Sequence, residues 1–252
     1  MNSVVASLGA FVAIFCGALA GVGLARRLPE PHLSNETRTA VSVSMAVVGT
    51  LTALVIGLMI SSASSSFNAR TDAIESLAVD IIRLNRALVR YGPEADPIRE
   101  SLRIYTRAKT QDLSDQNPGN TLGLSTLSMF EAVSDQVLRL HPADERQRQL
   151  QLQALKLLDA IADARWLFVE KSSISIPLPF LVLLIFWLAL LFGSFGLFAP
   201  QNATVIVVLL LCAMAISGGI LMILELGRPT QGLIQPSVAP MLTAIDEIAP
   251  LR

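Results

Sequence analysis

An uninterrupted stretch from Ala40 to Tyr91 constrains this chain more than any other feature, because it predicts one helix that leaves a membrane and continues into water. Its first half, Val41 to Ile60, is almost entirely apolar. At about 1.5 Å per residue this half is long enough to cross a bilayer core of about 30 Å. No proline or glycine between Gly57 and Gly92 marks a break where the lipid ends.

The second half of this stretch is amphipathic. It opens with a cluster of serines, namely Ser61, Ser62, Ser64, Ser65 and Ser66. Apolar residues then recur at alternating three- and four-residue steps, at Ile74, Leu77, Ile81, Leu84 and Leu88. This is the spacing of a coiled-coil seam with charges on the other faces. We therefore expect this half to pack against other helices outside the lipid.

The composition of the whole chain is that of a membrane protein. Of its 252 residues, 52% are hydrophobic and 15% are charged, and the mean hydropathy is +0.57. The net charge of -1 argues against a nucleic-acid partner. Three further apolar segments predict membrane helices, at Val4–Ala25, Leu178–Phe198 and Ala203–Leu226. Basic residues follow the first segment instead of preceding it, so we expect a retained helix and not a signal peptide.

These segments predict an all-α membrane protein with two transmembrane hairpins flanking an all-helical soluble region. The expected parts are a first hairpin over residues 1–63, a soluble region over 64–173, a second hairpin over 174–226, and a tail over 227–252. We expect the tail to pack on the soluble region and to end in a short helix. Soluble helices are expected after a stop at Gly92-Pro93, from Pro97 to about Asp112, from Leu124 to Leu140 and from Pro142 towards Lys171.

The sequence offers no catalytic constellation. His32 and His141 lie in unrelated predicted connections, and neither can be combined with a nucleophile or with a set of metal ligands. Cys16 and Cys212 fall in apolar segments, where we expect small buried hydrophobic residues. We therefore expect no enzymatic activity, no metal and no cofactor.

One side of the long predicted helix carries a pattern suited to an ion pathway. The residues at helical spacing along it are Thr50, Leu54, Gly57, Ser61 and Ser65. They place hydroxyl donors above and below a narrow apolar collar. A partly dehydrated anion needs such donors, and an apolar ring can gate by dewetting. Arg70, about one turn further on, is expected at the pore mouth, where it would raise the local anion concentration. Alternatively, the hydroxyls bond their own backbone and pack against neighbours.

Two smaller features of the apolar segments also allow an interpretation. Gly17 and Gly21 form a G-x-x-x-G pair, which either permits close approach of another helix or reflects the general frequency of glycine in membrane helices. Glu225 and Arg228, three residues apart at the end of the last segment, are expected to form an ion pair that anchors the end of that helix.

The order of several short motifs resembles the bestrophin-like four-transmembrane family of bacteria and plants. The motifs are Ile81-Ile82-Arg83-Leu84-Asn85-Arg86, Tyr91-Gly92-Pro93-Glu94-Ala95, Asp163-Ala164-Arg165-Trp166, Ile176-Pro177-Leu178-Pro179-Phe180, Phe195-Gly196-Leu197-Phe198-Ala199-Pro200 and Leu224-Glu225-Leu226-Gly227-Arg228-Pro229. The resemblance runs from the second membrane helix onward. The chain departs from it at Asn85 and Gly227, where family members usually have Asp.

This resemblance implies an oligomeric anion channel, such as a chloride channel, with a central pore lined by the second membrane helix of each subunit. It also implies a homo-oligomer, expected to be a ring of four or five subunits, surrounded by lipid in a bacterial inner membrane. The distribution of basic residues favours a cytoplasmic soluble region. An alternative of a different class is a membrane-anchored helical sensor or scaffold without a permeation path.

Overall fold

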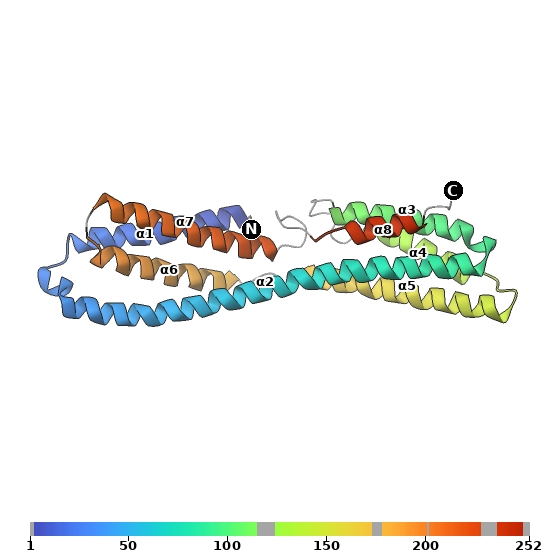
Figure 1. The fold of residues 1–252 in the computed structure, drawn as a ribbon, viewed down its shortest axis with the longest axis horizontal. Helices are drawn as coiled ribbons and strands as arrows, with labels where there is room; N and C mark the ends of the chain where they lie inside the picture. Colours follow the sequence, from blue (N-terminus) through green and yellow to red (C-terminus); the bar gives the residue numbers. More distant parts are fainter. Residues whose placement is uncertain (1–2, 115–123, 173–177, 201, 228–235, 249–252) are drawn as a thin grey trace. The chain divides into compact units, whose positions relative to one another are not determined.

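A computed structural model of the chain describes residues 3–114, 124–172, 178–200, 202–227 and 236–248. Every regular element in these ranges is a helix (Figure 1), which confirms the all-α class. The chain divides into two compact units. The first comprises residues 1–65 and 175–227, and the second comprises residues 66–174 and 228–252.

Among the described residues, four helices are long and apolar enough to cross a membrane. All four lie in the first unit, although the second of them continues into the other unit. They are α1 (Ser3–Ala25), α2 (Asn35–Tyr91), α6 (Leu178–Phe198) and α7 (Ala203–Leu226). A short 3-10 helix, η1 (Glu30–Leu33), lies between α1 and α2. The number and type of membrane helices therefore agree with the sequence, and α2 is continuous over 57 residues.

Helix α1 packs closely against α6 through glycines. A Cβ atom added to Gly17 would lie 2.6 Å from the carbonyl oxygen of Ala189, and one added to Gly21 would overlap the backbone of Gly193. Only a residue without a side chain permits this approach of two backbones. The Gly17 and Gly21 pair is thus a packing motif, which decides between the two interpretations that the sequence allowed.

The long helix begins earlier than expected, at Asn35 instead of Ala40. Ser34 explains the difference, because its Oγ accepts a hydrogen bond of 3.3 Å from the backbone N–H of Thr37. This is the arrangement of a helix N-cap. A polar cap can precede an apolar segment by several residues, so hydropathy alone places the start of the helix too late.

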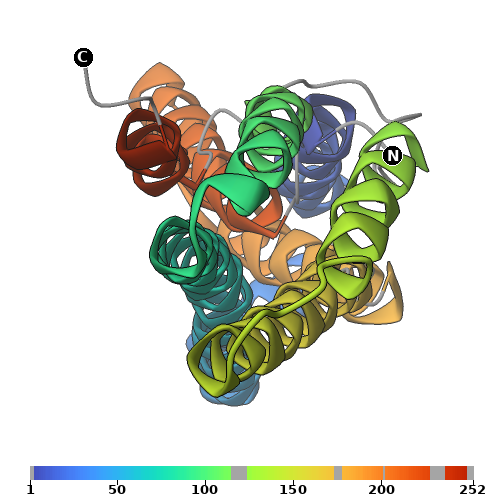
Figure 2. The same ribbon diagram turned by 90° about the vertical axis from the view of Figure 1, so that its right-hand side faces the viewer.

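The second unit is a bundle formed by the rest of α2 and four shorter helices. They are α3 (Asp96–Ser114), α4 (Leu124–Leu138), α5 (Glu145–Ser172) and α8 (Ala239–Ile248), with the 3-10 helix η2 (Pro93–Ala95) between α2 and α3. Figure 2 looks along these helices and shows them around a shared interior. Helix α8 packs on α3.

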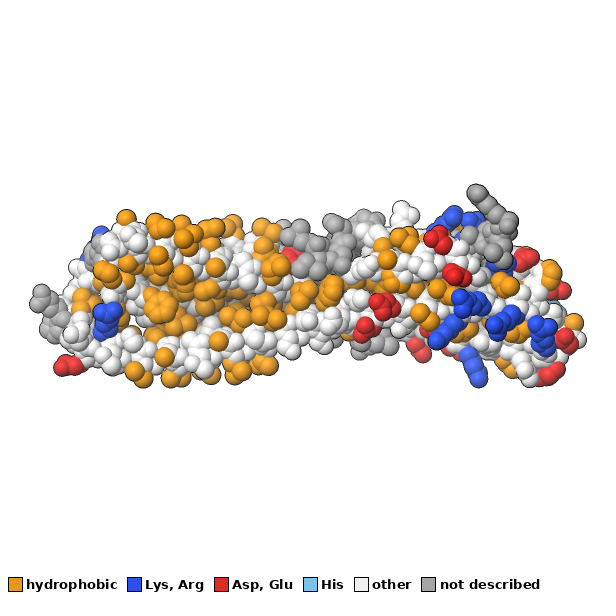
Figure 3. Space-filling view, in the orientation of Figure 1, with side chains coloured by type: hydrophobic (Ala, Val, Ile, Leu, Met, Phe, Trp, Pro, Cys, Tyr) orange, Lys and Arg blue, Asp and Glu red, His pale blue; other side chains and the backbone are white. Residues whose placement is uncertain are grey.

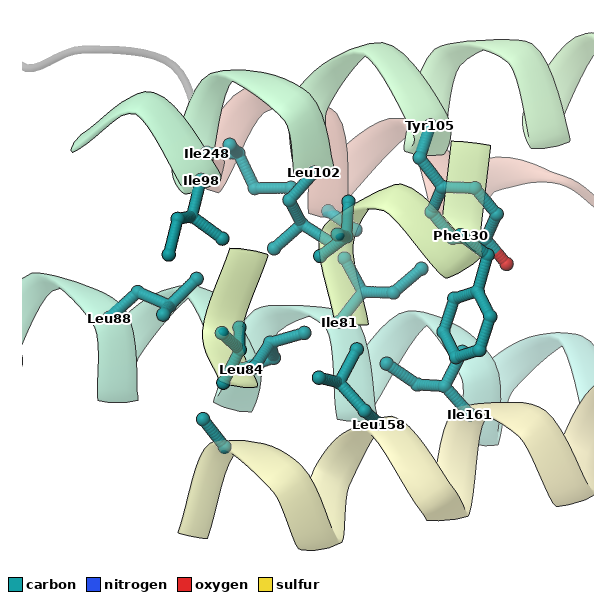
Figure 4. Packing of buried hydrophobic residues seen from close by; sticks show 14 of the residues in the cluster. Ile81, Leu84, Leu88, Ile98, Leu102, Tyr105, Phe130, Leu158, Ile161 and Ile248 are labelled. Atoms are coloured by element: carbon teal, nitrogen blue, oxygen red, sulfur yellow. The ribbon is translucent and has the colours of Figure 1, made fainter. Parts of the chain in front are cut away.

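The predicted seam of α2 forms one wall of the core of this bundle. Ile74, Leu77, Ile81, Leu84 and Leu88 are all buried. Figure 4 shows Ile81, Leu84 and Leu88 facing side chains from α3, α4, α5 and α8. Burial of each such aliphatic side chain contributes about 1.5–3 kcal/mol to folding.

Single residues determine where α2 ends and where α5 begins. Gly92 has a φ of 130°, which other residues rarely adopt, and it ends α2 as expected. Helix α5 begins at Glu145 and not at Pro142, because the Asp144 carboxylate accepts a hydrogen bond of 2.7 Å from the N–H of Gln147 and caps the helix there.

The prediction that the two cysteines are buried is wrong. Cys16 and Cys212 are both exposed, on α1 and α7. The outer face of a membrane helix is apolar because lipid is its solvent. An apolar neighbourhood in the sequence therefore does not reveal which face of such a helix is buried.

Candidate functional site

Helix α2 is the least enclosed of the membrane helices. Only 11% of its most apolar window is buried, compared with 22 to 28% for α1, α6 and α7. Figure 3 shows hydrophobic side chains covering the membrane helices, while charged side chains gather over the helices of the second unit. A membrane helix with so much free surface requires further neighbours, either lipid or protein.

The five residues of the predicted ion pathway lie together on the exposed side of α2. Thr50, Leu54, Gly57, Ser61 and Ser65 are all exposed, and 60% of the Leu54 surface is accessible. A Cβ atom added to Gly57 would meet nothing within 4 Å, so this position opens onto free space in the single chain. Thr52, Met59 and Ala63, which point the other way, are buried.

The hydroxyl of Thr50 donates a hydrogen bond of 2.9 Å to the carbonyl oxygen of Ala46, one turn earlier in α2. Thr52 makes the equivalent bond to Val48 at 2.7 Å. For these two threonines the backbone bond that the alternative interpretation expected is present. An oxygen that donates to its own helix still presents lone pairs, but its proton is not directed at an ion.

Arg70 does not lie at an exposed pore mouth, so this prediction is corrected. Its side chain is only 1% exposed and belongs to the second unit. The cause is helical register: Arg70 follows Ser61 by nine residues, and at about 100° per residue it points to the opposite side of α2. The distance along the helix axis was considered in the prediction, but the direction around it was not.

Glu225 has a partner that the sequence did not indicate. Its carboxylate is 4% exposed and accepts a hydrogen bond from the Ser3 hydroxyl, so the end of α7 meets the start of α1. The positive end of the α1 dipole favours a carboxylate at this position. Arg228, the ion-pair partner expected from the sequence, lies outside the described residues.

The Asn85 side chain donates one hydrogen bond and accepts another in the second unit. Its Nδ2 donates to the carbonyl oxygen of Glu247 at 3.1 Å, and its Oδ1 accepts from Nε of Arg99 at 3.1 Å. An ionised aspartate could accept from Arg99 but could not donate to a carbonyl. The amide therefore connects α2 to both α3 and α8, which gives this position a structural reason to hold Asn and not Asp. At the other departure, Gly227 has a φ of -73°, a value that does not require glycine.

A pair of neighbouring cations in the second unit, the buried Lys109 and the half-buried Arg165, was not recognised in the sequence. Lys109 is 9% exposed, and burial together with the nearby Arg165 lowers its pKa to about 8 although Asp112 acts in the opposite direction. Arg165 donates to the carbonyl oxygen of Thr126 at 3.1 Å, and its guanidinium lies over the rings of Tyr105 and Phe130. Burial also raises the pKa of Tyr105.

Helical spacing could have located Lys109. It follows Ile98, Leu102 and Tyr105 on α3 at steps of four, three and four residues, so it continues the buried stripe of that helix. A lysine is not expected at a buried position of a helix, because lysine is seldom fully buried.

Comparison with known proteins agrees with this arrangement of helices. A family model described as the bestrophin-like domain matches residues 12–241, and the chain belongs to the bestrophin-like family. This membership is consistent with a channel in a membrane.

Two solved structures have a similar fold. One is a bacterial bestrophin homologue from Klebsiella pneumoniae with a mutation, with a TM-score of 0.64 and 14% identity over 96% of this chain and 97% of that chain. The other is described as a membrane protein with a point substitution, with a TM-score of 0.63 and 13% identity over the same shares. Among curated proteins, none matches the chain.

Proposed function

We propose that this protein is an anion channel, with chloride as a permeant ion, whose central pore is lined by α2 from several copies of the chain. The observation that carries the proposal is the exposed side of α2 at membrane depth, with the hydroxyls of Ser61 and Ser65 beyond an apolar segment. Hydroxyls are unfavourable against hydrocarbon. A water-filled path between neighbouring copies of α2 would hydrate them.

In this proposal, Leu54 and Gly57 form the narrow apolar part of the pore. Leu54 projects from the exposed side, whereas Gly57 adds no side chain one turn later. A ring of leucines would hold back water and ions until the helices move apart, which is how an apolar constriction gates by dewetting. The serine hydroxyls at Ser61 and Ser65 would replace part of the hydration shell of an anion without binding it as tightly as a fixed cation would.

A chloride flux assay of the purified protein in liposomes tests the proposal. Leu54→Ser introduces a hydroxyl into the apolar ring and is expected to increase flux, while Ser61→Ala is expected to lower the preference for anions over cations. Leu211→Ser is the matched control, because Leu211 is an exposed leucine on α7, away from α2.

Two outcomes would contradict the pore assignment. The first is a reconstituted protein that carries no chloride under any gradient or pH. The second is an equal response of flux to Leu54→Ser and Leu211→Ser, because an effect of leucine removal in general would not depend on the α2 surface.

A further inference from the structure

A groove in the first unit lies beside α2, on a different side from the proposed pore surface. Its volume is about 570 Å³, and it separates the first turns of α2 from the last turns of α6. On α2 it is lined by a central stripe of Arg38, Ser42, Met45 and Gly49, at steps of four, three and four residues, with Val41 and Ala46 on either side of it. At about 100° per residue, Met45 points about 140° away from Thr50, so the groove faces the flank of the helix.

The chemistry of this groove changes along its length. Arg38 and Ser42 stand at the end nearest the connection from α1, and Met45 and Gly49 follow towards the interior of the membrane. Leu191 of α6 closes the inner end, since a Cβ atom on Gly49 would lie 3.8 Å from its Cδ2. The eleven residue steps from Arg38 to Gly49 span about 16 Å, or about half of a bilayer core.

A second hollow adjoins the first on the other side of Phe195. Its volume is about 330 Å³, and it lies between α6 and α7. Phe195 and Ala199 line both hollows. Apart from Thr204 and Cys212, the side chains around the second hollow are hydrocarbon. The two hollows therefore offer one cationic end and two neighbouring apolar channels.

We propose that these hollows bind one anionic phospholipid. Its phosphate lies at the Arg38 guanidinium with the Ser42 hydroxyl as a second donor, one acyl chain follows the groove between α2 and α6, and the other lies across Phe195 in the adjoining hollow. A phosphate oxygen is a strong acceptor for arginine. The hydrocarbon chains match the mostly apolar remainder of both linings, in which the Ser194 hydroxyl donates to the carbonyl oxygen of Leu191 in its own helix.

The position of Arg38 favours a ligand over a structural role. It lies in the first turns of α2, where a cation opposes the helix dipole and so does not stabilise the helix. Glu36 lies two residues earlier, about 200° around the helix, and points away from the groove. A second copy of the chain could fill the apolar part of the groove but would bring no phosphate to Arg38. Free phosphate would leave the apolar part unfilled.

Tryptophan quenching by lipids with brominated acyl chains tests this site in the full-length protein. The chain has two tryptophans, and Trp187 lies on α6 one turn before Leu191, next to the inner end of the groove. Trp166→Phe removes the other, which is 72% exposed in the second unit. Brominated phosphatidylglycerol is titrated against brominated phosphatidylcholine in mixed micelles.

The expected result is half-maximal quenching of Trp187 at a lower fraction of phosphatidylglycerol than of phosphatidylcholine. Arg38→Gln is expected to raise the required fraction of phosphatidylglycerol about tenfold, which corresponds to the loss of one charged hydrogen bond. Arg38→Lys keeps the positive charge and is expected to restore part of the affinity for phosphatidylglycerol. Arg27→Gln is the matched control, because Arg27 is exposed in the connection that leads into α2 but does not line the groove.

Three results would overturn the proposal. Equal effects of Arg38→Gln and Arg27→Gln would mean that the lipid responds to general surface charge. Relief of quenching by glycerol phosphate at the same concentration as unbrominated phosphatidylglycerol would indicate a site for a free anion. A change in subunit number caused by Arg38→Gln, measured by native mass spectrometry, would assign the groove to an interface between copies.

Discussion

At the scale of single residues, helical spacing predicts burial of two charged side chains that their residue type would place at the surface. Arg70 and Lys109 are both buried cations, at 1% and 9% exposure. The register of α2 places Arg70 on the same side as the seam that begins at Ile74, four residues later. Both burials follow from helical spacing, although charged residues are seldom buried.

Lys109 predicts an unusual dependence of stability on pH. Its pKa falls from an ordinary value of 10.5 to about 8 in the folded protein. Between these values the unfolded chain binds one more proton than the folded chain, so the free energy of unfolding rises with pH. Below about pH 8 both states are protonated, and the folded state carries the full penalty, on the order of 3 kcal/mol.

The difference in unfolding temperature between the wild type and Lys109→Met, measured in detergent from pH 7 to pH 10.5, checks this expectation. Lys109→Met keeps a flexible apolar stem and removes the charge. The variant is expected to be more stable at pH 7, and its advantage is expected to shrink as the pH rises. A constant difference across this range would show that the amine of Lys109 does not titrate there in the folded protein.

At the scale of elements, the sequence located the helices well and their packing partners poorly. The bounds of α6 and α7 agree with hydropathy because both begin and end at polar or proline-containing connections. The predicted starts of α2 and α5 were wrong, because the N-cap side chains of Ser34 and Asp144 determine where these helices begin. The G-x-x-x-G pair did not predict that α6 packs against α1, because small residues allow another helix to approach but do not determine which helix it is.

The contact between α1 and α6 predicts that Gly21→Leu destabilises the first unit strongly. A side chain at this position would overlap the backbone of Gly193, so the helices would have to separate. Overpacking typically destabilises a protein by about 1–3 kcal/mol, and a backbone clash belongs at the upper end of this range. The unfolding temperature in detergent is expected to fall accordingly.

Gly9→Leu is the matched control on the same helix. A Cβ atom at Gly9 meets nothing within 4 Å, so the leucine points outward from α1. Its effect is expected to stay within about 0.5 kcal/mol, as for most surface substitutions. If both variants lose the same stability, the cause is the general loss of glycine and not the approach of α1 to α6.

At the scale of the whole molecule, fold class and family followed from the sequence, whereas the site remained incomplete. Four apolar segments and one seam are sufficient for an all-helical membrane protein, because each is a local pattern. The pathway residues Thr50 to Ser65 share an exposed side of α2, and in the proposed channel their partners belong to other copies of the chain. A single sequence contains no direct record of such contacts.

The orientation in the membrane predicts which positions a reagent can reach from outside the cell. We expect the second unit to be cytoplasmic and the connection between α1 and α2 to face outward. In a background of Cys16→Ser and Cys212→Ser, Arg27→Cys is expected to react with a membrane-impermeant maleimide in intact cells. Arg146→Cys, in the second unit, is expected to react only after permeabilisation. Labelling of Arg146→Cys from outside would favour the external sensor over the channel.

The assembly of the chain gives the last prediction, because a pore lined by α2 requires a closed ring of identical subunits. Native mass spectrometry is expected to show four or five copies. In the same cysteine-free background, Ser61→Cys is expected to form disulfides between subunits, since Ser61 would lie close to the ring axis. Leu211→Cys on the exposed face of α7 is the control and is expected to remain reduced. A dimer joined through Leu211→Cys would place α7 at the interface and α2 in lipid, and a dimer of this kind leaves no central pore.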